Sequence, residues 1–258
     1  MTKLIFITGA SSGIGQAFAW RFYQAGYTLA LVARRTDEIK TWASQQGISA
    51  ERYQIYSADV SDIDSIVAAG KQCLKTQGVP DVVIANAGIS VGMDTAVRAD
   101  LDVMVRTFAT NNIGLAATFH PFVDAMVQRG SGALVGIGSV GGIRGMPGHG
   151  AYCSSKAAVI SYMESLRGEL RAFGVQAVTI CPGYIDTPLT SKNRYPMPFL
   201  MQPAEFADEA FSAIEKRVSY LVIPWQMGVV AKLLRLLPNG LLDKAFAGRP
   251  RKRRSDGS

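Results

Sequence analysis

Three residues in the middle of the chain have side chains suited to proton transfer at a carbonyl group. Tyr152 and Lys156 are four residues apart in a stretch with helical periodicity, which places them on one helix face. Ser139 lies at the end of an expected strand. A free tyrosine has a pKa of about 10, and a nearby ammonium lowers it by favouring the phenolate. The pattern predicts an acid–base site in which Ser139 holds the substrate oxygen beside Tyr152, although a Tyr–Lys pair alone is more often an ordinary helix-surface pair.

A glycine-rich loop lies between the first expected strand and the first expected helix, and it reads TGASSGIG over residues 8–15. In such loops the first glycine permits a tight turn, the second lets the backbone approach a pyrophosphate, and the third lets the helix pack on the strand. Free N–H groups at the helix N-terminus attract the phosphates. An ordinary turn is the alternative, but the position of the loop in an alternating chain favours dinucleotide binding. The residues predicted to bind are Gly9, Ser11, Ser12, Gly13, Ile14 and Gly15.

The residues after the second expected strand indicate which dinucleotide binds. A carboxylate there hydrogen-bonds the ribose 2′-hydroxyl of NAD, whereas an arginine accommodates the 2′-phosphate of NADP. The chain has Arg34 and Arg35 here, while Asp37 and Glu38 belong to the first turn of the next expected helix. The pattern predicts that Arg34 and Arg35 favour NADP(H) over NAD(H), the alternative being a solvated pair at a strand end.

Stretches rich in aliphatic and β-branched residues alternate with stretches of helical periodicity along most of the chain. Expected strands are 3–8, 28–33, 53–57, 81–85, 133–137, 175–180 and 219–223, and expected helices are 14–25, 36–46, 62–77, 99–128 and 151–173. This alternation predicts a doubly wound α/β fold of Rossmann type, with one parallel sheet in three α/β/α layers. Neither a repeat nor a linker divides the chain, so a single domain is expected, with order ending near Phe246.

The composition narrows the classes of protein to which the chain can belong. Its 258 residues are 48% hydrophobic and 18% charged, which suits a large core and excludes global disorder. Cys73, Cys153 and Cys181 lack metal-ligand or redox spacing, so reduced thiols in a cytoplasmic protein are expected, with no metal. The sequence has neither a signal-peptide stretch nor an apolar run long enough for a spanning helix.

The net charge is +7, and residues 249–258 contribute five basic and one acidic side chain. Nucleic acid is not an expected partner, because no aromatic or groove-reading residues accompany this basic tail.

Several motifs occur together and in one order: TGASSGIG at residues 8–15, Asn86-Ala87-Gly88, Ser139, YCSSK at residues 152–156, and Pro182-Gly183. Over roughly residues 1–220, this set closely resembles the short-chain dehydrogenase/reductase (SDR) family in its standard-length branch. The resemblance implies a parallel sheet of about seven strands with the site at the strand carboxyl ends. It also implies that Tyr152 is the general acid in reduction and the base in oxidation. Lys156 would bind the nicotinamide ribose and lower the pKa of Tyr152, and Ser139 would orient the carbonyl.

The resemblance extends to further residues around the cofactor. It selects Asn111, within residues 110–114, as the holder of a water that links Lys156 to solvent, with Asn112 as a packing or capping residue. Asp59 followed by Val60 matches the family's adenine contact, although an N-terminal helix cap explains Asp59 equally well. The other implied cofactor contacts are Asn86, Ala87 and Gly88 at the ribose, Pro182 and Gly183, and Ile185 and Thr187 at the carboxamide.

Two departures from the family pattern bear on the substrate. Ala85 replaces the asparagine that often precedes the Asn-Ala-Gly motif, a small change. The Gly-rich ending common in fatty-acid-synthesis reductases is absent, which argues against a ketoacyl reductase of that pathway. Specificity is expected in loops 88–94, 141–150 and 184–202, where apolar residues 197–201 predict either a lid over a hydrophobic substrate or packing at the lid or a subunit contact. His149 is expected to be a loop residue without a chemical role.

Residues 225–247 form an unusual C-terminal element with two apolar helical faces separated by Pro238. The expected arrangement is a helical extension that packs on the body or on a second subunit. The alternative is contact with an anionic membrane, assisted by the basic residues up to Arg254. The chain thus divides into an NADP-binding catalytic domain (1–224, with the substrate loop near 184–202), a helical extension (225–247) and a flexible basic tail (248–258).

Together these patterns predict an NADPH-dependent oxidoreductase that reduces a ketone or aldehyde, or oxidises the secondary alcohol, on a small apolar substrate. Two other functions stay open: a catalytically silent NADP-binding sensor or interaction protein, and a membrane-peripheral reductase of lipid-like ketones. The intact set of Ser139, Tyr152 and Lys156 disfavours the sensor. The resemblance implies a homodimer or homotetramer paired through helices 99–128 and 151–173, and a cytoplasmic protein with membrane association as a variant.

Overall fold

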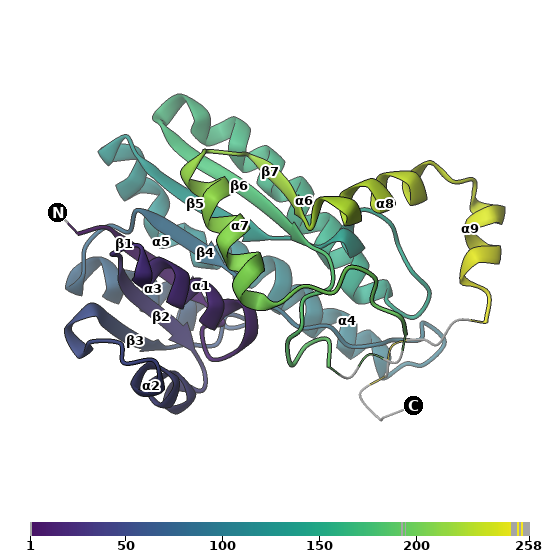
Figure 1. The fold of residues 1–258 in the computed structure, drawn as a ribbon, viewed down its shortest axis with the longest axis horizontal. Coiled ribbons are helices and arrows are strands. Elements are labelled where there is room, and N and C mark those ends of the chain that lie inside the picture. The colour runs from purple at the N-terminus through teal and green to yellow at the C-terminus, as the bar shows by residue number, and fades with distance from the viewer. Residues whose placement is uncertain (1, 192, 194, 249–251, 253, 255–258) are drawn as a thin grey trace.

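Seven parallel strands form one sheet through the centre of the molecule (Figure 1). The computed structural model describes residues 2–191, 193, 195–248, 252 and 254. The sheet order is β3-β2-β1-β4-β5-β6-β7. The winding direction therefore reverses between β1 and β4, which opens a crevice at the strand carboxyl ends. The strands are β1 (Leu4–Thr8), β2 (Thr28–Ala33), β3 (Tyr53–Ser57), β4 (Val82–Ala85), β5 (Gly132–Ile137), β6 (Val175–Pro182) and β7 (Tyr220–Ile223).

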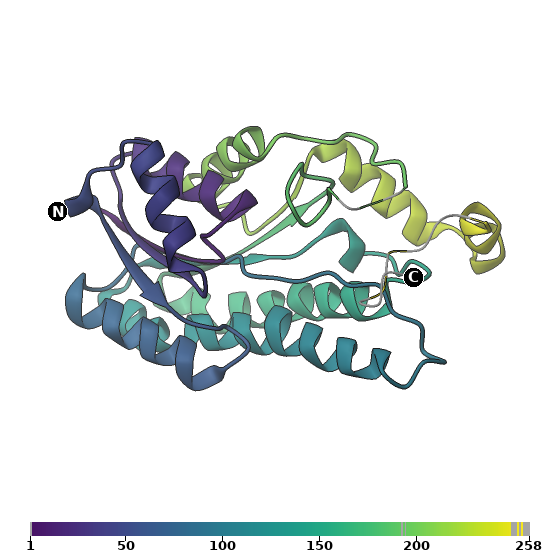
Figure 2. The ribbon, with the colours of Figure 1, turned by 90° about the horizontal axis from the view of Figure 1, so that it is seen from below.

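Helices cover both faces of the sheet, so that three layers are seen edge-on (Figure 2). One face carries α1 (Gly13–Gln24), α2 (Thr36–Gln45) and α7 (Pro203–Glu215). The other carries α3 (Ile63–Thr76), α5 (Gly114–Arg129) and α6 (Gly150–Leu170), with α4 (Asp100–Phe108) against α6. Beyond β7, α8 (Trp225–Leu236) and α9 (Asn239–Phe246) extend past the carboxyl end of the sheet (Figure 1). The predicted doubly wound α/β fold is confirmed.

The two cores explain why the strands are apolar at nearly every position. Along β1, Ile5 and Ile7 point to the face that holds Phe18 of α1, whereas Phe6 points to the face that holds Phe122 of α5. All five residues of β1 are buried, as expected for a parallel strand covered on both sides. This rigid platform holds the loops that follow β1, β2, β4, β5 and β6 in fixed positions.

One predicted helix is wrong in its continuity. The helix expected over 99–128 is interrupted by a π-helical turn, Ala109–Ile113, between α4 and α5. The turn brings Gly114 so close to the carbonyl oxygen of Val60 that a Cβ there would collide with it. A π turn is a single-residue widening with no periodic signature in sequence, and such turns are frequent at functional sites.

The remaining general expectations concern thiols, membranes and metals. Cys73, Cys153 and Cys181 are buried free cysteines. Within the part of the chain that the structure describes, no helix has the length and hydropathy needed to cross a bilayer. Over the same residues, no group of three or more potential metal ligands gathers. Most of the basic tail predicted at 248–258 lies outside the described residues.

Candidate active site

A cleft of about 820 Å³ lies at the carboxyl ends of the central strands. It joins the glycine loop, the end of β2, the loop after β4, the start of α6 and the end of β6. The predicted residues that line it are Gly9, Ser11, Ser12, Gly13, Ile14, Arg34, Arg35, Asp59, Val60, Asn86, Ala87, Gly88, Tyr152, Lys156, Pro182 and Thr187. Gly15, Asn111, Ser139, Gly183 and Ile185 do not line it.

The glycine loop is held against the loop after β4. Gly9 has a φ of 69°, and a Cβ on it would lie 2.9 Å from the Cα of Ala87. The Asn86 side-chain amide donates to the carbonyl oxygen of Thr8 at 3.0 Å, which fastens the two loops together. A Cβ on Gly15 would collide with the carbonyl oxygen of Gly9, so Gly15 serves the close approach of α1 rather than the cleft surface. The resulting concave backbone is a cradle that fits a pyrophosphate.

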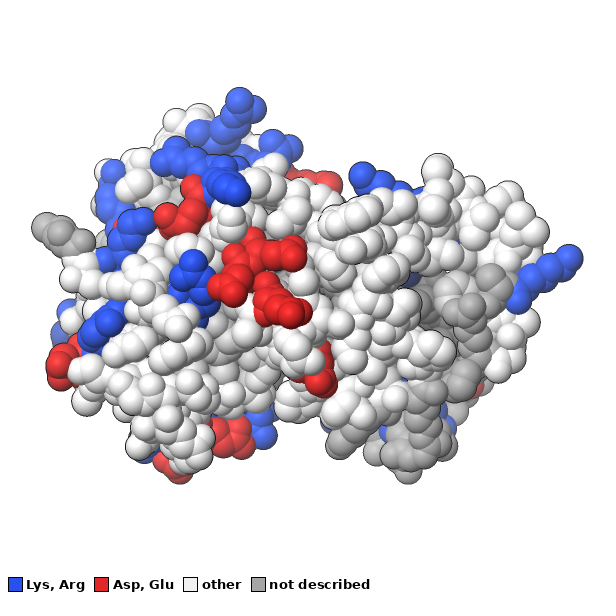
Figure 3. Space-filling model, in the orientation of Figure 1, with Lys and Arg blue, Asp and Glu red and all other residues white. Residues whose placement is uncertain are grey.

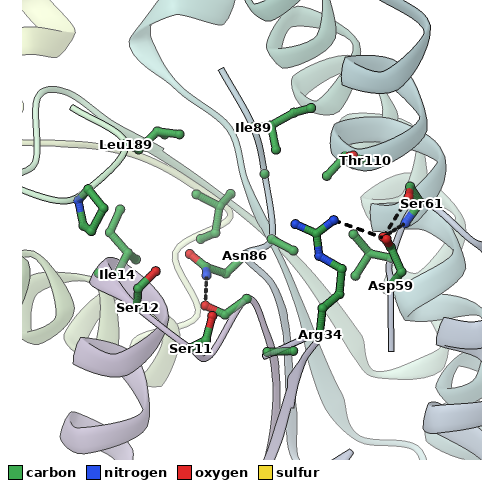
Figure 4. Close-up of a pocket in the computed structure, with 18 of the residues that line it drawn as sticks. Ser11, Ser12, Ile14, Arg34, Asp59, Ser61, Asn86, Ile89, Thr110 and Leu189 are labelled. Carbon is green, nitrogen blue, oxygen red and sulfur yellow. Dashed lines mark hydrogen bonds and ion pairs between the residues drawn. The ribbon is translucent and has the colours of Figure 1, made fainter. Parts of the chain in front are cut away.

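The end of β2 supplies positive charge at one end of the cleft (Figure 4). Arg34 reaches across to Asp59, with 3.3 Å between Nη1 and Oδ2, and its side chain is 70% exposed. Arg35 donates from Nη2 to Oγ of Ser11 at 3.4 Å, so its guanidinium lies beside the glycine loop. Arg35 also forms an ion pair with Glu38 at 3.1 Å. Two accessible guanidinium groups next to the phosphate cradle suit an additional phosphate.

Asp59 faces the cleft rather than a helix end. Its Oδ1 accepts hydrogen bonds from the backbone N and the Oγ of Ser61, at 2.9 and 2.7 Å. Burial raises the pKa of Asp59, but the hydrogen bonds from Ser61 and the positive charge of Arg34 outweigh burial and hold the pKa below its usual range. The helix cap considered for Asp59 is wrong: α3 is capped by Asp62, which accepts from the backbone N of Ser65.

Tyr152 and Lys156 lie one turn apart near the N-terminus of α6, which begins at Gly150. The Lys156 Nζ is 6.0 Å from the centre of the Tyr152 ring. The same ammonium donates to the carbonyl oxygen of Ile137 at the end of β5, at 2.7 Å. Lys156 is 5% exposed, so a positive charge is held almost without solvent beside the phenol.

Burial controls the protonation of both side chains. It raises the pKa of Tyr152 to about 12, and the Ser139 side chain only partly offsets this effect. Burial also lowers the pKa of Lys156 to about 8. Desolvation of the phenolate thus determines the net direction of the Tyr152 pKa, and the lowering of this pKa by Lys156 stays a prediction. Tyr152 is consequently a neutral proton donor near pH 7.

The Ser139 hydroxyl lies close to the Tyr152 ring. A Cβ on Gly141 would lie 3.3 Å from Cε1 of Tyr152 and 3.4 Å from Oγ of Ser139, so the two side chains flank one point. The Ser139 hydroxyl accepts the backbone N–H of Gly141 at 3.0 Å. With its oxygen engaged in this way, the Ser139 hydroxyl can direct its own proton towards a neighbouring oxygen.

Asn111 sits inside the π turn and is fully buried. Its amide binds both backbone groups of Ile89, at 2.9 and 3.0 Å, and donates to Oγ of Ser155 at 2.9 Å. A Cβ on Gly88 would lie 3.3 Å from Asn111 Oδ1 and 3.6 Å from Lys156 Nζ, so both groups lie close to Gly88. Asn112 instead donates to the backbone carbonyl of Ser155 at 2.8 Å, which is a packing role.

Gly183 and Ile185, two of the cofactor contacts implied around the end of β6, do not line the cleft. The Ile185 side chain is 2% exposed and belongs to the core, and its backbone pairs with that of Met201. A Cβ on Gly183 would lie 2.8 Å from Cγ of Met227, so Gly183 gives room for α8. The residues of this loop that line the cleft are their neighbours Thr187, Pro188 and Leu189.

The structure adds residues that sequence reasoning missed. Ser61, Ile89 and Thr110 line the cleft next to the predicted Val60, Gly88 and Asn111 (Figure 4). Their position next to motif residues in the sequence is the one feature that could have identified them as cleft residues. Leu189 lines the cleft from the 184–202 loop, whereas Phe199 is 50% exposed, so the apolar stretch 197–201 points largely to solvent rather than over the cleft.

Three substrate-side loops meet the end of the chain. Arg254 binds the buried Asp100 with 2.6 Å between Nε and Oδ2, and Oδ2 also accepts the backbone N–H of Asp94. Lys252 donates to Oδ1 of Asn193 at 3.1 Å. His149, at the start of α6, is 7% exposed, and burial together with the Lys252 charge lowers its pKa to about 4. His149 is therefore a buried, neutral residue at the end of the loop that precedes α6.

Comparison with known proteins assigns this site to a family. A family model described as short chain dehydrogenase matches residues 3–197. The chain belongs to the short-chain dehydrogenase family. It is 34% identical over 243 residues to an uncharacterized oxidoreductase of Myxococcus xanthus (strain DK1622), covering 94% of this chain and 96% of the relative. SDR membership makes the chain an oxidoreductase.

Solved SDR structures share the fold along most of the chain. An alcohol dehydrogenase from the archaeon Thermococcus sibiricus, complexed with 5-hydroxy-NADP, matches with a TM-score of 0.76 and 29% identity over 86% of this chain and 96% of its own. A 3-ketoacyl-(acyl-carrier-protein) reductase from Brucella melitensis, complexed with NADH, matches with a TM-score of 0.77 and 25% identity over 86% and 96%. Similar proteins thus bind either dinucleotide.

Proposed function

We propose that this SDR protein is an NADPH-dependent reductase of an apolar ketone or aldehyde, which also oxidises the corresponding secondary alcohol. The observation that carries the proposal is one continuous cleft with Arg34 and Arg35 at one end and Tyr152 and Lys156 at the other. Its middle is the cradle formed by the glycine loop. When bound, a nicotinamide dinucleotide supplies the hydride for reduction or accepts it in oxidation.

The preference for NADPH rests on the charge at the end of β2. Arg34 and Arg35 both line the cleft, and Arg35 touches Ser11 of the phosphate cradle. Glu38, a nearby carboxylate that could bind a 2′-hydroxyl, is engaged by Arg35. A 2′-phosphate placed between the two arginines would form charge-assisted hydrogen bonds, whereas a bare hydroxyl would leave the guanidinium groups without an anion.

The proton chemistry rests on the burial of Tyr152. With a pKa of about 12 it is protonated at neutral pH, so it can donate to a carbonyl oxygen that gains negative charge. Ser139 would hold that oxygen in place, and the nearby Lys156 ammonium would stabilise the phenolate left behind. Asn111 would hold the water through which the proton is replaced. In oxidation, Tyr152 would act in the opposite sense, as the base.

The substrate class rests on the cleft lining beyond Tyr152. Ile89, Val91 and Leu189 contribute aliphatic surface there. An apolar substituent on the carbonyl would be buried against these side chains, whereas a charged one would lose its hydration. We also propose a homo-oligomer that pairs through α4 and α6, where Leu101, Val105 and Tyr162 are exposed.

A nicotinamide fluorescence titration of the purified protein with NADPH and with NADH tests the cofactor preference. The expected result is about 10–100-fold tighter binding of NADPH, the magnitude of one or two charge-assisted hydrogen bonds. The NADPH complex is then offered aliphatic, aromatic and long-chain ketones, and oxidation of NADPH is followed by absorbance. Turnover is expected for apolar ketones.

Other outcomes of these experiments would favour a different function or a different cofactor. Tighter binding of NADH would contradict the reading of Arg34 and Arg35 without touching the catalytic assignment. Tight NADPH binding with no turnover on any ketone or alcohol, in either direction, would favour the sensor. Equal turnover of charged and apolar ketones would contradict the proposed substrate class.

A further inference from the structure

Large apolar side chains are exposed to solvent along the outward face of α8. We define it by Trp225, Val229, Leu233 and Leu236, which are 69%, 48%, 59% and 81% exposed. Their spacing of four, four and three residues places them in one stripe. The opposite face of α8 holds the buried residues Met227, Gly228 and Ala231, so the helix is anchored to the body and its stripe points away from it.

The second helix continues this surface. In α9, Leu242 is buried while Leu241 is 54% exposed. Both helices extend beyond the carboxyl end of the sheet, on the side that carries the 184–202 loop (Figure 1). In the space-filling view the surface over α8 and α9 is mostly uncharged, with Lys or Arg side chains at its edge (Figure 3). An exposed stripe of large apolar side chains with basic side chains at its edge is typical of an interaction site.

The charge distribution indicates what covers this face. Residues 225–258 contain eight Lys and Arg and two Asp, so they carry +6 of the net charge of +7, and residues 1–224 carry only +1. Lys232, Arg235 and Lys244 are exposed beside the apolar stripe. A second copy of the chain would place its own Lys232, Arg235 and Lys244 against the same three side chains, and these like charges would repel each other. A surface that is both apolar and anionic matches the extension on both counts.

We propose that the outward face of α8, with Leu241 of α9, docks on a bilayer that contains anionic phospholipid. Trp225 and the leucines would enter the boundary between headgroups and acyl chains, and the three basic side chains would bind phosphates in the headgroup layer. The contact is peripheral, because no helix among the described residues is long and apolar enough to span a membrane. It does not depend on the proposed activity.

Docking in this orientation bears on the substrate of the proposed reductase. The Arg144 guanidinium donates to Oδ1 of Asn239 at 2.9 Å, which ties the loop after β5 to the start of α9. The substrate-side loops and the docking face are therefore connected, and both lie at the carboxyl end of the sheet. If the proposed function holds, its substrate is a ketone that partitions into membranes and reaches Tyr152 from the bilayer.

Co-sedimentation of the full chain with vesicles tests the docking. We expect binding to vesicles of phosphatidylcholine with phosphatidylglycerol, weak binding to phosphatidylcholine alone, and loss of binding at high salt. The double substitution Leu233→Glu with Leu236→Glu is expected to weaken binding to the anionic vesicles by about tenfold or more. The matched control, Ile63→Glu with Phe173→Glu, adds the same charges at side chains that are both 52% exposed elsewhere on the surface, and should bind as the unaltered protein does.

Two further measurements keep the proposal open to contradiction. Trp225 fluorescence should shift to the blue on binding and be quenched by brominated lipid, and Trp225→Phe should remove the signal. The circular dichroism spectrum and a cooperative urea transition of each variant verify that it is folded. Absence of binding by the folded protein, or equal loss in the control pair, would overturn the proposal. A smaller oligomer for the Leu233/Leu236 variant in light scattering, without vesicle binding by the unaltered protein, would show that a second copy covers the face.

Discussion

The two ends of the cleft use charge in opposite ways. At the β2 end, Arg34 and Arg35 have side chains that are 70% and 63% exposed, and their carboxylate partners sit at the surface. At the α6 end, Lys156 is 5% exposed and its ammonium binds only a backbone carbonyl among the contacts seen. Exposed charges are accessible and can recognise a charged ligand. Buried ones have shifted pKa values, which suits proton transfer but weakens the fold.

The comparison predicts that a change at the buried end abolishes chemistry without loss of cofactor binding. Tyr152→Phe removes the proton donor and should lower turnover by about 10³-fold, while the NADPH dissociation constant changes little. Steady-state kinetics and the fluorescence titration measure the two effects. Tyr162→Phe on the same helix, where the side chain is 37% exposed, is the matched control and should retain full turnover. Retained turnover in Tyr152→Phe would remove Tyr152 from the mechanism.

Changes at the exposed end of the cleft are expected to weaken the binding of NADPH rather than to abolish the chemistry. The double substitution Arg34→Ala with Arg35→Ala should weaken NADPH binding by about 10–100-fold, because charge-assisted hydrogen bonds to phosphate are lost. NADH binding and the unfolding temperature should change little. Arg98→Ala, which breaks an exposed ion pair with Asp102 outside the cleft, should alter neither cofactor. Equal weakening of NADPH and NADH would mean that the arginines do not contact a 2′-phosphate.

The buried ammonium should destabilise the protein in a pH-dependent way. Because the fold lowers the pKa of Lys156 to about 8, the unfolded chain binds more protons between that pH and the ordinary lysine pKa. The cost is therefore fully present below pH 8 and is relieved as the pH rises above it. Lys156→Met should raise the free energy of unfolding by about 1–3 kcal/mol at pH 7 and abolish turnover.

Urea unfolding at pH 7 and pH 10 measures this effect as the difference between Lys156→Met and the unaltered protein. The difference should shrink at the higher pH. Lys40→Met, whose side chain is 63% exposed, should show no such pH-dependent difference. A gain in stability for Lys156→Met that is equal at both pH values would show that packing rather than charge is responsible.

The smallest effect is expected from the ion pair that bridges the cleft at its exposed end. Asp59→Asn releases Arg34 from an exposed ion pair worth at most about 1 kcal/mol. NADPH should therefore bind more tightly, by a factor of about five at most. Titration with both dinucleotides measures the change. Weaker binding of NADPH and NADH alike would instead support the adenine contact that the SDR resemblance implies for Asp59.

The features that were predictable from sequence are those with a local or periodic signature. Strand β1 and the glycine loop were recognisable because a continuous apolar run gives way to small residues within ten positions. The pairing of Tyr152 with Lys156 followed from helical spacing. The π turn around Asn111 was not predictable, since it depends on the approach of Gly114 to Val60 in the folded chain. The raised pKa of Tyr152 was also missed, because the extent of desolvation is a tertiary property.

The C-terminal region shows the same limit. The apolar spacing in 225–237 was visible, but which side of α8 would face the body was decided by Gly183 and Met227, which meet only in the fold. The contact of Arg254 with Asp100 was not foreseen either, because a run of basic residues gives no indication of which one finds a partner.

The ion pair of Arg254 with Asp100 joins residues 154 positions apart. The entropy cost of closing a loop rises only with the logarithm of its length, so most of the cost of this contact is met when the sheet folds. Arg254 therefore restrains the Asp94–Asp100 segment, and a substitution of Arg254 would loosen that segment without disturbing the sheet.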